Sequence, residues 1–342
     1  MKEKNSKQNE AQASYNMVFE DNSVLPMLYG HGDSHLAKLE KKFGITASSR
    51  GNILALTGDR AAIEASKAVL ETLYADLKRG REVGAAQVDA AIRMAAHQDE
   101  GGEHSLFKGQ DIVIKTMKKN VRPYSSVQGK YMQILQTNDL VFALGPAGTG
   151  KTYIAVAMAV AQFISGRVEK IILSRPAVEA GEKLGFLPGD LKEKVDPYLR
   201  PLYDALFDMI PAEKLSRHIE NGEIEVAPLA FMRGRTFSNA FVILDEAQNT
   251  TATQMKMFLT RMGENSRMVA TGDLSQTDLP KDVKSGLSDA VRKLEGIDGI
   301  GLVRFSDRDV VRHALAAKII KAYDEWDRKK RLGNRQLEND DK

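Results

Sequence analysis

The feature that most constrains this chain is segment 145–152, which reads Gly-Pro-Ala-Gly-Thr-Gly-Lys-Thr and matches the pattern GxxxxGK[ST] at every fixed position. It follows the apolar run 140–144, which is typical of a buried central strand, and precedes a helical pattern over 153–164. Glycines in such a turn let successive backbone N–H groups point at phosphate oxygens, and the helix adds its positive N-terminal end. The segment therefore predicts a nucleoside-triphosphate site at a strand end of an α/β sheet.

The residue types in this loop have separate expected roles. We expect Lys151 to reach the β- and γ-phosphates and Thr152 to bind Mg²⁺. The residues expected to contact the nucleotide are Gly145, Pro146, Ala147, Gly148, Thr149, Gly150, Lys151 and Thr152. A glycine turn without a ligand is the alternative, and the flanking strand and helix argue against it.

A second apolar strand ends in two adjacent carboxylates. Residues 241–244 lead into Asp245 and Glu246, which places both side chains at the carboxyl edge of a parallel sheet, where ligands bind. We expect Asp245 to hold Mg²⁺ directly or through water, and Glu246 to orient and deprotonate the attacking water. A capped loop would explain these two residues alone. Paired with the glycine-rich loop, they predict hydrolysis as well as binding.

Two glutamines are candidates for further contacts with the nucleotide. A third apolar strand, 268–271, runs toward Gln276, which is a candidate sensor of the γ-phosphate. Gln128 precedes the first strand of the sheet, and its amide offers both a donor and an acceptor for reading an adenine edge. A surface glutamine is the alternative for Gln128.

Composition narrows the class of protein. The chain has 342 residues, enough for two domains, and its net charge of +3 means that any nucleic-acid surface has to be a local patch. It has no cysteine, which excludes disulfides and thiolate chemistry and fits a reducing compartment. Its polar beginning and the lack of a long apolar run predict a cytoplasmic protein without a membrane span. The six histidines show no metal-binding spacing, so no zinc chemistry is expected.

The pattern of the chain predicts five segments. These are a disordered N-terminus (1–14), a small α+β module (15–80), a linker or extension (81–120) with a helical stretch over 85–96, the nucleotide domain (121–323), and a charged C-terminal tail (324–342). The expected fold class is α/β, with a parallel sheet covered by helices on both faces, preceded by the small α+β domain.

The small module resembles a K-homology-like RNA-binding fold. It is predicted to contain two helices joined by a glycine-containing turn, then a β-hairpin and a closing helix. The K-homology signature is a GxxG loop that clamps a nucleic-acid backbone. Here the turn is Gly30-His31-Gly32-Asp33, which lacks the second glycine and puts a carboxylate where phosphates would lie. A degenerate module used for assembly or protein contact is the alternative.

With these elements in order, the chain closely resembles the PhoH-like family of ATPases, which is similar to the core of superfamily 1 helicases. The resemblance covers about residues 15–323. It is carried by GPAGTGKT (145–152), SRPAVEAGEKLGFLPGD (174–190), FMRGRTF (231–237), ILDEAQNTT (243–251), TGDLSQTDLP (271–280) and FSDRDVVRH (305–313).

The resemblance implies an ATPase that uses ATP and Mg²⁺ and acts on or near RNA. It also implies a link to a YbeY-type endoribonuclease of ribosomal RNA maturation, and a homo-oligomeric ring, for which a hexamer is one option. The chain has a single nucleotide core, so any closure on ATP has to come from a neighbouring subunit. The sequence does not give the RNA target or the number of subunits.

An arginine at the γ-phosphate accelerates phosphoryl transfer, and it can come from the same or another subunit. We favour Arg233 or Arg235 supplied across a subunit interface. The other candidates are Arg304, Arg308 and Arg312. Surface arginines or arginines that bind RNA phosphate are the alternative for all five.

A glycine-rich loop over 181–189 is a candidate for nucleic-acid contact. Arg175, Lys183 and Phe186 would supply charge and stacking to a single strand; a structural loop at an oligomer interface explains the same residues.

The main hypothesis is thus an RNA-associated ATPase. A nucleotide-gated adaptor that holds a ribonuclease or ribosomal partner is the second hypothesis. A small-molecule kinase is a third, weakened by the lack of an acceptor motif.

Overall fold

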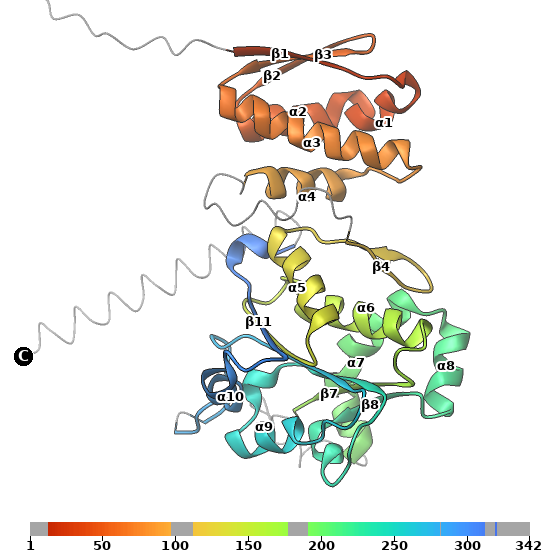
Figure 1. The fold of residues 1–342 in the computed structure, drawn as a ribbon, viewed down its shortest axis with the longest axis vertical. Helices are drawn as coiled ribbons and strands as arrows, with labels where there is room; N and C mark the ends of the chain where they lie inside the picture. The colour runs from red at the N-terminus through yellow and green to blue at the C-terminus, as the bar shows by residue number, and fades with distance from the viewer. Residues whose placement is uncertain (1–12, 97–111, 177–190, 281, 312–318, 320–342) are drawn as a thin grey trace, which may run out of the picture. The chain divides into compact units, whose positions relative to one another are not determined.

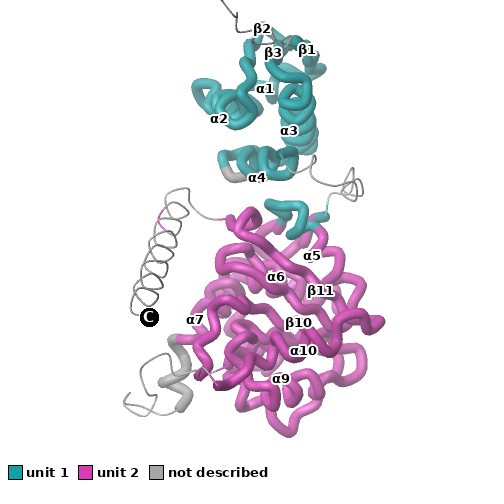
Figure 2. The backbone as a smooth tube through the Cα atoms, turned by 90° about the vertical axis from the view of Figure 1, so that its left-hand side faces the viewer, with its two compact units in different colours: residues 1–112, 122–129 teal, residues 113–121, 130–342 magenta. Residues whose placement is uncertain are grey.

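The structure is a computed structural model that describes residues 13–96, 112–176, 191–280, 282–311 and 319. The chain divides into two compact units, which Figure 2 colours separately: residues 1–112 with 122–129, and residues 113–121 with 130–342. Residues 1–12 of the predicted disordered N-terminus lie outside the described residues, whereas residues 13 and 14 belong to the first strand and were wrongly included in that segment. The linker at 98–103, the glycine-rich loop with Lys183 and Phe186, Arg312 and the charged tail also lie outside them.

The first unit is an α+β module with a three-stranded antiparallel sheet in the order β1-β3-β2 (Figure 1). Its element order, strand, two helices, hairpin and helix, is the one predicted from the sequence. The elements are β1 (Ala13–Val18), η1 (Asn22–Val24), α1 (Leu25–Tyr29), η2 (His31–Asp33), α2 (Ser34–Phe43), β2 (Thr46–Arg50), β3 (Ile53–Gly58) and α3 (Arg60–Lys78). Alternation along β3 buries Leu54 and Leu56, which pack with Leu70 and Leu73 of α3. The likeness to a K-homology fold stays a prediction.

Helix α4 (Ala85–Ala96) has the bounds that the sequence pattern predicts for a helix. The sequence assigned it to the connection between the domains. In the structure it packs against α3, and Val88, Ala91, Ile92 and Ala95 join the hydrophobic core of the first unit. An apolar stripe on a helix has to be covered, and here α3 and α2 cover it.

The second unit is built on a sheet of six parallel strands in the order β11-β6-β10-β9-β7-β8; β7, β8 and β11 are labelled in Figure 1. The strands are β6 (Leu140–Leu144), β7 (Lys170–Arg175), β8 (Ile224–Pro228), β9 (Ala240–Leu244), β10 (Arg267–Gly272) and β11 (Ile300–Arg304). Every residue of β6 and β9 is buried, as expected for central strands of a parallel sheet. The predicted α/β class is therefore confirmed.

Helices cover both faces of this sheet. On one face Phe142, Val242 and Ala270 pack in one hydrophobic cluster with Phe258 of α9 (Ala252–Leu259) and Leu287 of α10 (Gly286–Leu294). Side chains of successive strand residues alternate between the two faces. The other face is covered by α6 (Lys151–Ile164), which contacts β7, β9 and β10, and by α7 (Leu191–Met209), which contacts β7 and β8.

The remaining elements connect or flank this sheet. They are the short hairpin β4 (Ile114–Lys115) and β5 (Asn120–Val121), α5 (Ser126–Thr137), α8 (Ala212–Glu220), η5 (Leu229–Met232), η6 (Ala247–Asn249) and η7 (Asp307–Asp309). A strand was predicted around 112–114. The structure has β4 at Ile114–Lys115, which overlaps the prediction at Ile114 only. No helix in the described part of the chain is long and apolar enough to cross a membrane.

Candidate functional site

The glycine-rich loop connects β6 to α6 and is shaped by its glycines. Gly145, Gly148 and Gly150 have φ angles of 142°, 82° and 81°, a region that side chains rarely adopt. A Cβ at Gly145 would lie 2.5 Å from the Phe305 carbonyl oxygen, so the backbone passes where no larger residue fits. Gly150 is the N-cap residue of α6 and, as a glycine, has no side chain with which to cap that helix. The loop therefore offers the turn and the helix N-terminus that an anion site needs.

Lys151 folds back over the loop. Its Nζ donates to the carbonyl oxygens of Gly145 (2.6 Å) and Pro146 (2.7 Å), and lies 3.3 Å from Thr149 Oγ1. Its residue surface is 8% exposed. The Tyr131 hydroxyl donates to the Lys151 carbonyl oxygen, and the Tyr131 ring packs edge-on against Phe305. The ammonium group is thus held at the loop, where a bound phosphate would offer it stronger acceptors.

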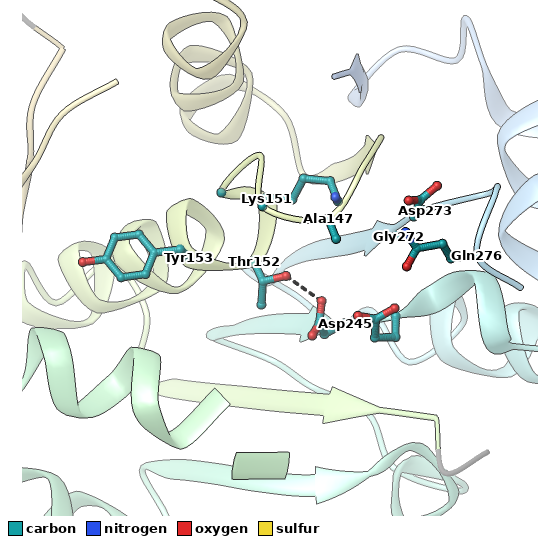
Figure 3. A pocket seen from close by; sticks show the side chains of 11 residues that line it. Ala147, Lys151, Thr152, Tyr153, Asp245, Gly272, Asp273 and Gln276 are labelled. Carbon is teal, nitrogen blue, oxygen red and sulfur yellow. Dashed lines mark hydrogen bonds between the residues drawn. The ribbon is translucent and has the colours of Figure 1, made fainter. Parts of the chain in front are cut away.

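Thr152, Asp245 and Thr271 form a cluster of side-chain oxygens, of which Figure 3 shows Thr152 and Asp245. Thr152 Oγ1 donates to Asp245 Oδ1 at 2.6 Å, and Thr271 Oγ1 donates to the same oxygen at 2.7 Å. The parallel register of β9 with β10 brings Thr271 beside Asp245, and Asp245 N donates to the Ser174 carbonyl oxygen of β7. Hydroxyl and carboxylate oxygens suit Mg²⁺. The donor set therefore fits the predicted metal, with Thr152 and Asp245 as the side chains that would hold it.

Glu246 follows Asp245 with a φ of 51°, which is uncommon for a residue with a side chain. Its Oε1 lies 3.3 Å from Arg175 Nη2, and its Oε2 accepts a hydrogen bond of 2.5 Å from Gln248 Nε2. Both carboxylate oxygens are therefore engaged by neighbouring side chains.

Gln276 lies on the loop that follows β10. Its backbone N–H donates to the Asp273 carbonyl oxygen, and its own carbonyl oxygen accepts from Gln248 Nε2 at 3.1 Å. Asp273 is 7% exposed, and its Oδ2 is a buried oxygen without a hydrogen-bond partner among the described residues. A buried carboxylate oxygen of this kind is a place where a ligand, metal-bound water or cation group can bind.

These residues line one cavity of about 230 Å³ (Figure 3). Its lining consists of Ala147, Gly148, Gly150, Lys151, Thr152, Tyr153, Asp245, Glu246, Gly272, Asp273 and Gln276. The cavity thus brings together five of the eight loop residues predicted to contact the nucleotide with the residues predicted to bind metal, to act as base and to sense the γ-phosphate; Gly145, Pro146 and Thr149 are not in its lining. The ring of Tyr153 points away from Lys151 and Asp245 (Figure 3), and its hydroxyl donates to Asp208 Oδ2 at 2.7 Å.

Gln128 is not among the residues that line this cavity in the described structure. It lies in the first turn of α5, is 2% exposed, and its Oε1 accepts a hydrogen bond of 2.6 Å from the Tyr124 N–H. Gln128 is therefore buried, and the alternative of a surface glutamine is wrong. A role in reading the base stays a prediction.

The two favoured arginines also lie away from the cavity lining of the described residues. Arg235 makes a bidentate pair with Glu225 at 2.6 and 2.7 Å, and its guanidinium stacks on Phe237. The hydrogen bond to Glu225 raises the pKa of Arg235 above its ordinary value, with burial acting in the opposite direction. Arg233 is exposed. Neither can be placed at a γ-phosphate within the chain, and their use across a subunit interface stays a prediction.

Sequence reasoning did not assign a role at this site to Thr271, Asp273, Gln248 or Tyr131, and it gave Arg175 only a nucleic-acid role. Thr271 and Asp273 flank the end of the third strand, and Gln248 comes two residues after Glu246. Strand ends that meet at one edge could have indicated the first two. The contacts of Gln248 and Tyr131 depend on how distant elements pack, which no local pattern gives.

The chain was compared with families, curated proteins and solved structures. The family model described as "PhoH-like protein" matches residues 120–324. The chain is 52% identical over 297 residues to the PhoH-like protein of Bacillus subtilis (strain 168), covering 87% of this chain and 93% of that protein. It is 40% identical over 276 residues to Protein PhoH of Escherichia coli (strain K12), covering 79% and 75%.

Among solved structures it is similar to the Hef helicase domain of Pyrococcus furiosus, with 13% identity, a TM-score of 0.34, and coverage of 52% of this chain and 38% of that one.

Proposed function

The chain belongs to the PhoH-like protein family, and from this premise and the geometry of its cavity we propose that it is a Mg²⁺-dependent ATPase whose hydrolysis is coupled to RNA. The observation that carries the proposal is that Lys151, Thr152, Asp245 and Glu246 line one cavity at the carboxyl ends of parallel strands. A phosphate-binding loop, a hard-oxygen metal site and a carboxylate base are the parts that phosphoryl transfer to water needs.

The loop provides the phosphate site. Backbone N–H groups at the start of α6 would donate to phosphate oxygens, since no side chain caps that helix. Lys151 would exchange the carbonyl oxygens of Gly145 and Pro146 for phosphate oxygens. This exchange replaces neutral acceptors with charged ones, which makes the hydrogen bonds stronger.

Thr152 and Asp245 would hold the metal. Their oxygens are 2.6 Å apart, and Thr271 fixes Asp245 from the neighbouring strand. When bound, Mg²⁺ would neutralise charge on the phosphates and align them.

Glu246 is the proton acceptor in this proposal. It lines the cavity beside Asp245 and would take one proton from the attacking water as the water oxygen bonds to phosphorus and the bridging oxygen leaves with ADP. Gln276 lines the same cavity and would contact the γ-phosphate.

The finer parts of the proposal concern substrate and partners. Gln128 is proposed to read adenine, although it lies outside the cavity lining. RNA, a YbeY-type endoribonuclease and a homo-oligomeric assembly are proposed from the family resemblance, and a cytoplasmic location from the lack of cysteine and of a long apolar run. The RNA part is supported further by the first unit, where the loop Gly30–Asp33 joins two helices as a nucleic-acid-clamping loop would.

Steady-state ATP hydrolysis by the purified chain, with and without single-stranded RNA, tests this proposal. We expect RNA to raise kcat several-fold. Glu246→Gln should bind nucleotide and lose at least about 100-fold in kcat, since it removes the proton acceptor. A Glu246→Gln protein that turns over ATP at the wild-type rate would overturn the assigned base.

The engagement of both Glu246 oxygens by Arg175 and Gln248 favours a second candidate, the nucleotide-gated adaptor with slow hydrolysis. In that case the rate should stay low with RNA and rise with a protein partner. Transfer of the γ-phosphate to a small acceptor would instead support the kinase hypothesis.

A further inference from the structure

Arg175 is the last residue of β7 and pairs with the carboxylate proposed as the base. Its Nη2 lies 3.3 Å from Glu246 Oε1, while its Nη1 donates to the Tyr198 carbonyl oxygen of α7 at 3.0 Å. The Arg175 side chain is 24% exposed. The guanidinium therefore links helix α7 to the base and keeps part of its surface open to other ligands.

The geometry of the strands fixes this pair. Strands β7 and β9 are neighbours, with Ser174 opposite Leu244, and Asp245 N donates to the Ser174 carbonyl oxygen at 2.8 Å. The residues that follow, Arg175 and Glu246, are thereby brought together at the same edge of the sheet. A movement at the end of β7 would change the position of the Glu246 carboxylate directly.

Gln248 holds the other oxygen of the same carboxylate. It is 1% exposed, its Nε2 donates to Glu246 Oε2 and to the Gln276 carbonyl oxygen, and its Oε1 accepts from the Asp273 N–H. Glu246 is thus held on one oxygen by a buried amide and on the other by a partly exposed cation. An anion can compete with Glu246 for the Arg175 cation, whereas the Gln248 amide is buried and neutral.

A general base has to present a carboxylate oxygen to the water that it deprotonates. Here both oxygens face other donors, and the Glu246 backbone has a φ of 51°, a sparsely populated conformation of the kind that clusters at active sites and switch regions. The guanidinium and the attacking water compete for Oε1, and opening of the ion pair leaves this oxygen to the water.

We propose that Arg175 is a brake on Glu246, released when a phosphate oxygen takes over the guanidinium. This inference rests on the proposed function and adds its regulation. Arginine binds phosphate through two parallel N–H groups and so competes well with a single carboxylate contact. The phosphate has two possible sources, the backbone of a single-stranded RNA and the γ-phosphate of the nucleotide. Arg175 acts through Glu246 and is a positioning residue.

The test uses the full chain with Arg175→Gln, which keeps a polar side chain and removes the charge. If RNA is the source, kcat without RNA should rise several-fold, toward the RNA-stimulated value of the wild type, and further stimulation by oligouridylate should vanish. If the nucleotide is the source, equilibrium titrations should show that the preference for ATPγS over ADP falls about tenfold, without a rise in kcat.

Two further variants keep the test specific. Arg175→Lys should give intermediate values, because lysine keeps the charge and loses the bidentate geometry. Arg292→Ala removes a surface arginine that pairs with Asp289 at 2.9 Å on α10, and should match the wild type in every readout. Thermal unfolding of each variant would identify a change that is due only to misfolding.

The brake is overturned if Arg175→Gln lowers kcat while the RNA stimulation and the nucleotide preference stay at wild-type values, since Arg175 would then support Glu246. It is also overturned if all three readouts are unchanged. If the wild-type chain binds ATPγS but does not hydrolyse ATP, the proposed function is refuted instead. The equilibrium titrations with ATPγS and ADP would still test whether a phosphate releases the Arg175–Glu246 pair.

Discussion

Both units contain a glycine loop that leads into a helix, and the two loops differ in what surrounds them. Gly30–Asp33 joins α1 to α2 in the first unit, and Gly145–Gly150 joins β6 to α6 in the second. Neither α2 nor α6 has a side-chain hydrogen bond at its N-cap. Each loop thus leads into a helix N-terminus of the kind that attracts anions.

The difference lies in charge and packing. In the second loop Gly145 passes against the Phe305 backbone, and Lys151 and Thr152 follow at once. In the first loop a Cβ at Gly32 would meet nothing within 4 Å, and Asp33, with a φ of 57°, puts a carboxylate at the helix start. A glycine turn and a helix end are therefore insufficient for a phosphate site, and the strand edges behind the loop supply the rest.

The largest expected effect that separates the loops is that of Lys151→Ala. This change removes the cation that would bind the β- and γ-phosphates, so ATPγS affinity should fall at least about 100-fold, as expected when charge-assisted hydrogen bonds are lost in a buried site. Isothermal titration calorimetry measures it. Lys38→Ala is the matched control, since Lys38 lies on α2 and pairs with Asp89 in the first unit. Equal losses in both variants would contradict the assignment.

The same substitution in each loop tests the packing difference. Gly145→Ala should destabilise the second unit by about 2–4 kcal/mol, because the new Cβ would overlap the Phe305 carbonyl oxygen and the φ of 142° is strained. Gly32→Ala should cost the first unit only about 1 kcal/mol, for its left-handed backbone alone. Urea unfolding of each variant gives both values. If Gly32→Ala lowers the free energy of unfolding as much as Gly145→Ala does, the space around Gly32 is not open.

A change in charge at the first loop should make it more like a nucleic-acid clamp. Asp33→Gly completes GxxG across residues 30–33, suits the positive φ, and removes a carboxylate. Affinity for single-stranded RNA should rise about threefold to tenfold, as expected when one repulsive charge of about 1 kcal/mol is removed near a phosphate. Fluorescence anisotropy measures it. Asp33→Asn separates the loss of charge from the gain of a glycine, and unchanged affinity in both variants would favour a module used for assembly.

The smallest expected effect concerns how each following helix is anchored. Helix α2 is held by the Lys38–Asp89 pair, and α6 by Tyr153 and Asp208, which also pairs with Lys119 of the β4–β5 hairpin. Hydrogen bonds from Lys119 and then Tyr153 hold the pKa of Asp208 below its usual value of 3.8. A lowered carboxyl pKa adds stability above the unfolded value, and this stability is lost as pH falls through the folded value.

Asp208→Asn should therefore cost about 0.5 kcal/mol or less at pH 7, since the pair is half exposed, and nothing once the pH is well below 3.8. Unfolding midpoints of wild type and variant across this pH range check the sign. A difference that grows toward acid pH would contradict the proposed anchoring.

The sequence by itself determined the loop 145–152, the pair Asp245 and Glu246, the parallel α/β class and the element order of the first unit. Each of these depends on residues that are close in sequence: a buried strand, a turn that requires glycine, or a helix stripe. The tertiary structure decided which distant groups meet. Arg235 was a candidate for the γ-phosphate and pairs with Glu225, whereas Arg175 was a candidate for nucleic acid and pairs with Glu246. Strand order and register set these contacts, because they bring together residues 10 positions apart in the first pair and 71 in the second, and no local pattern encodes either pairing.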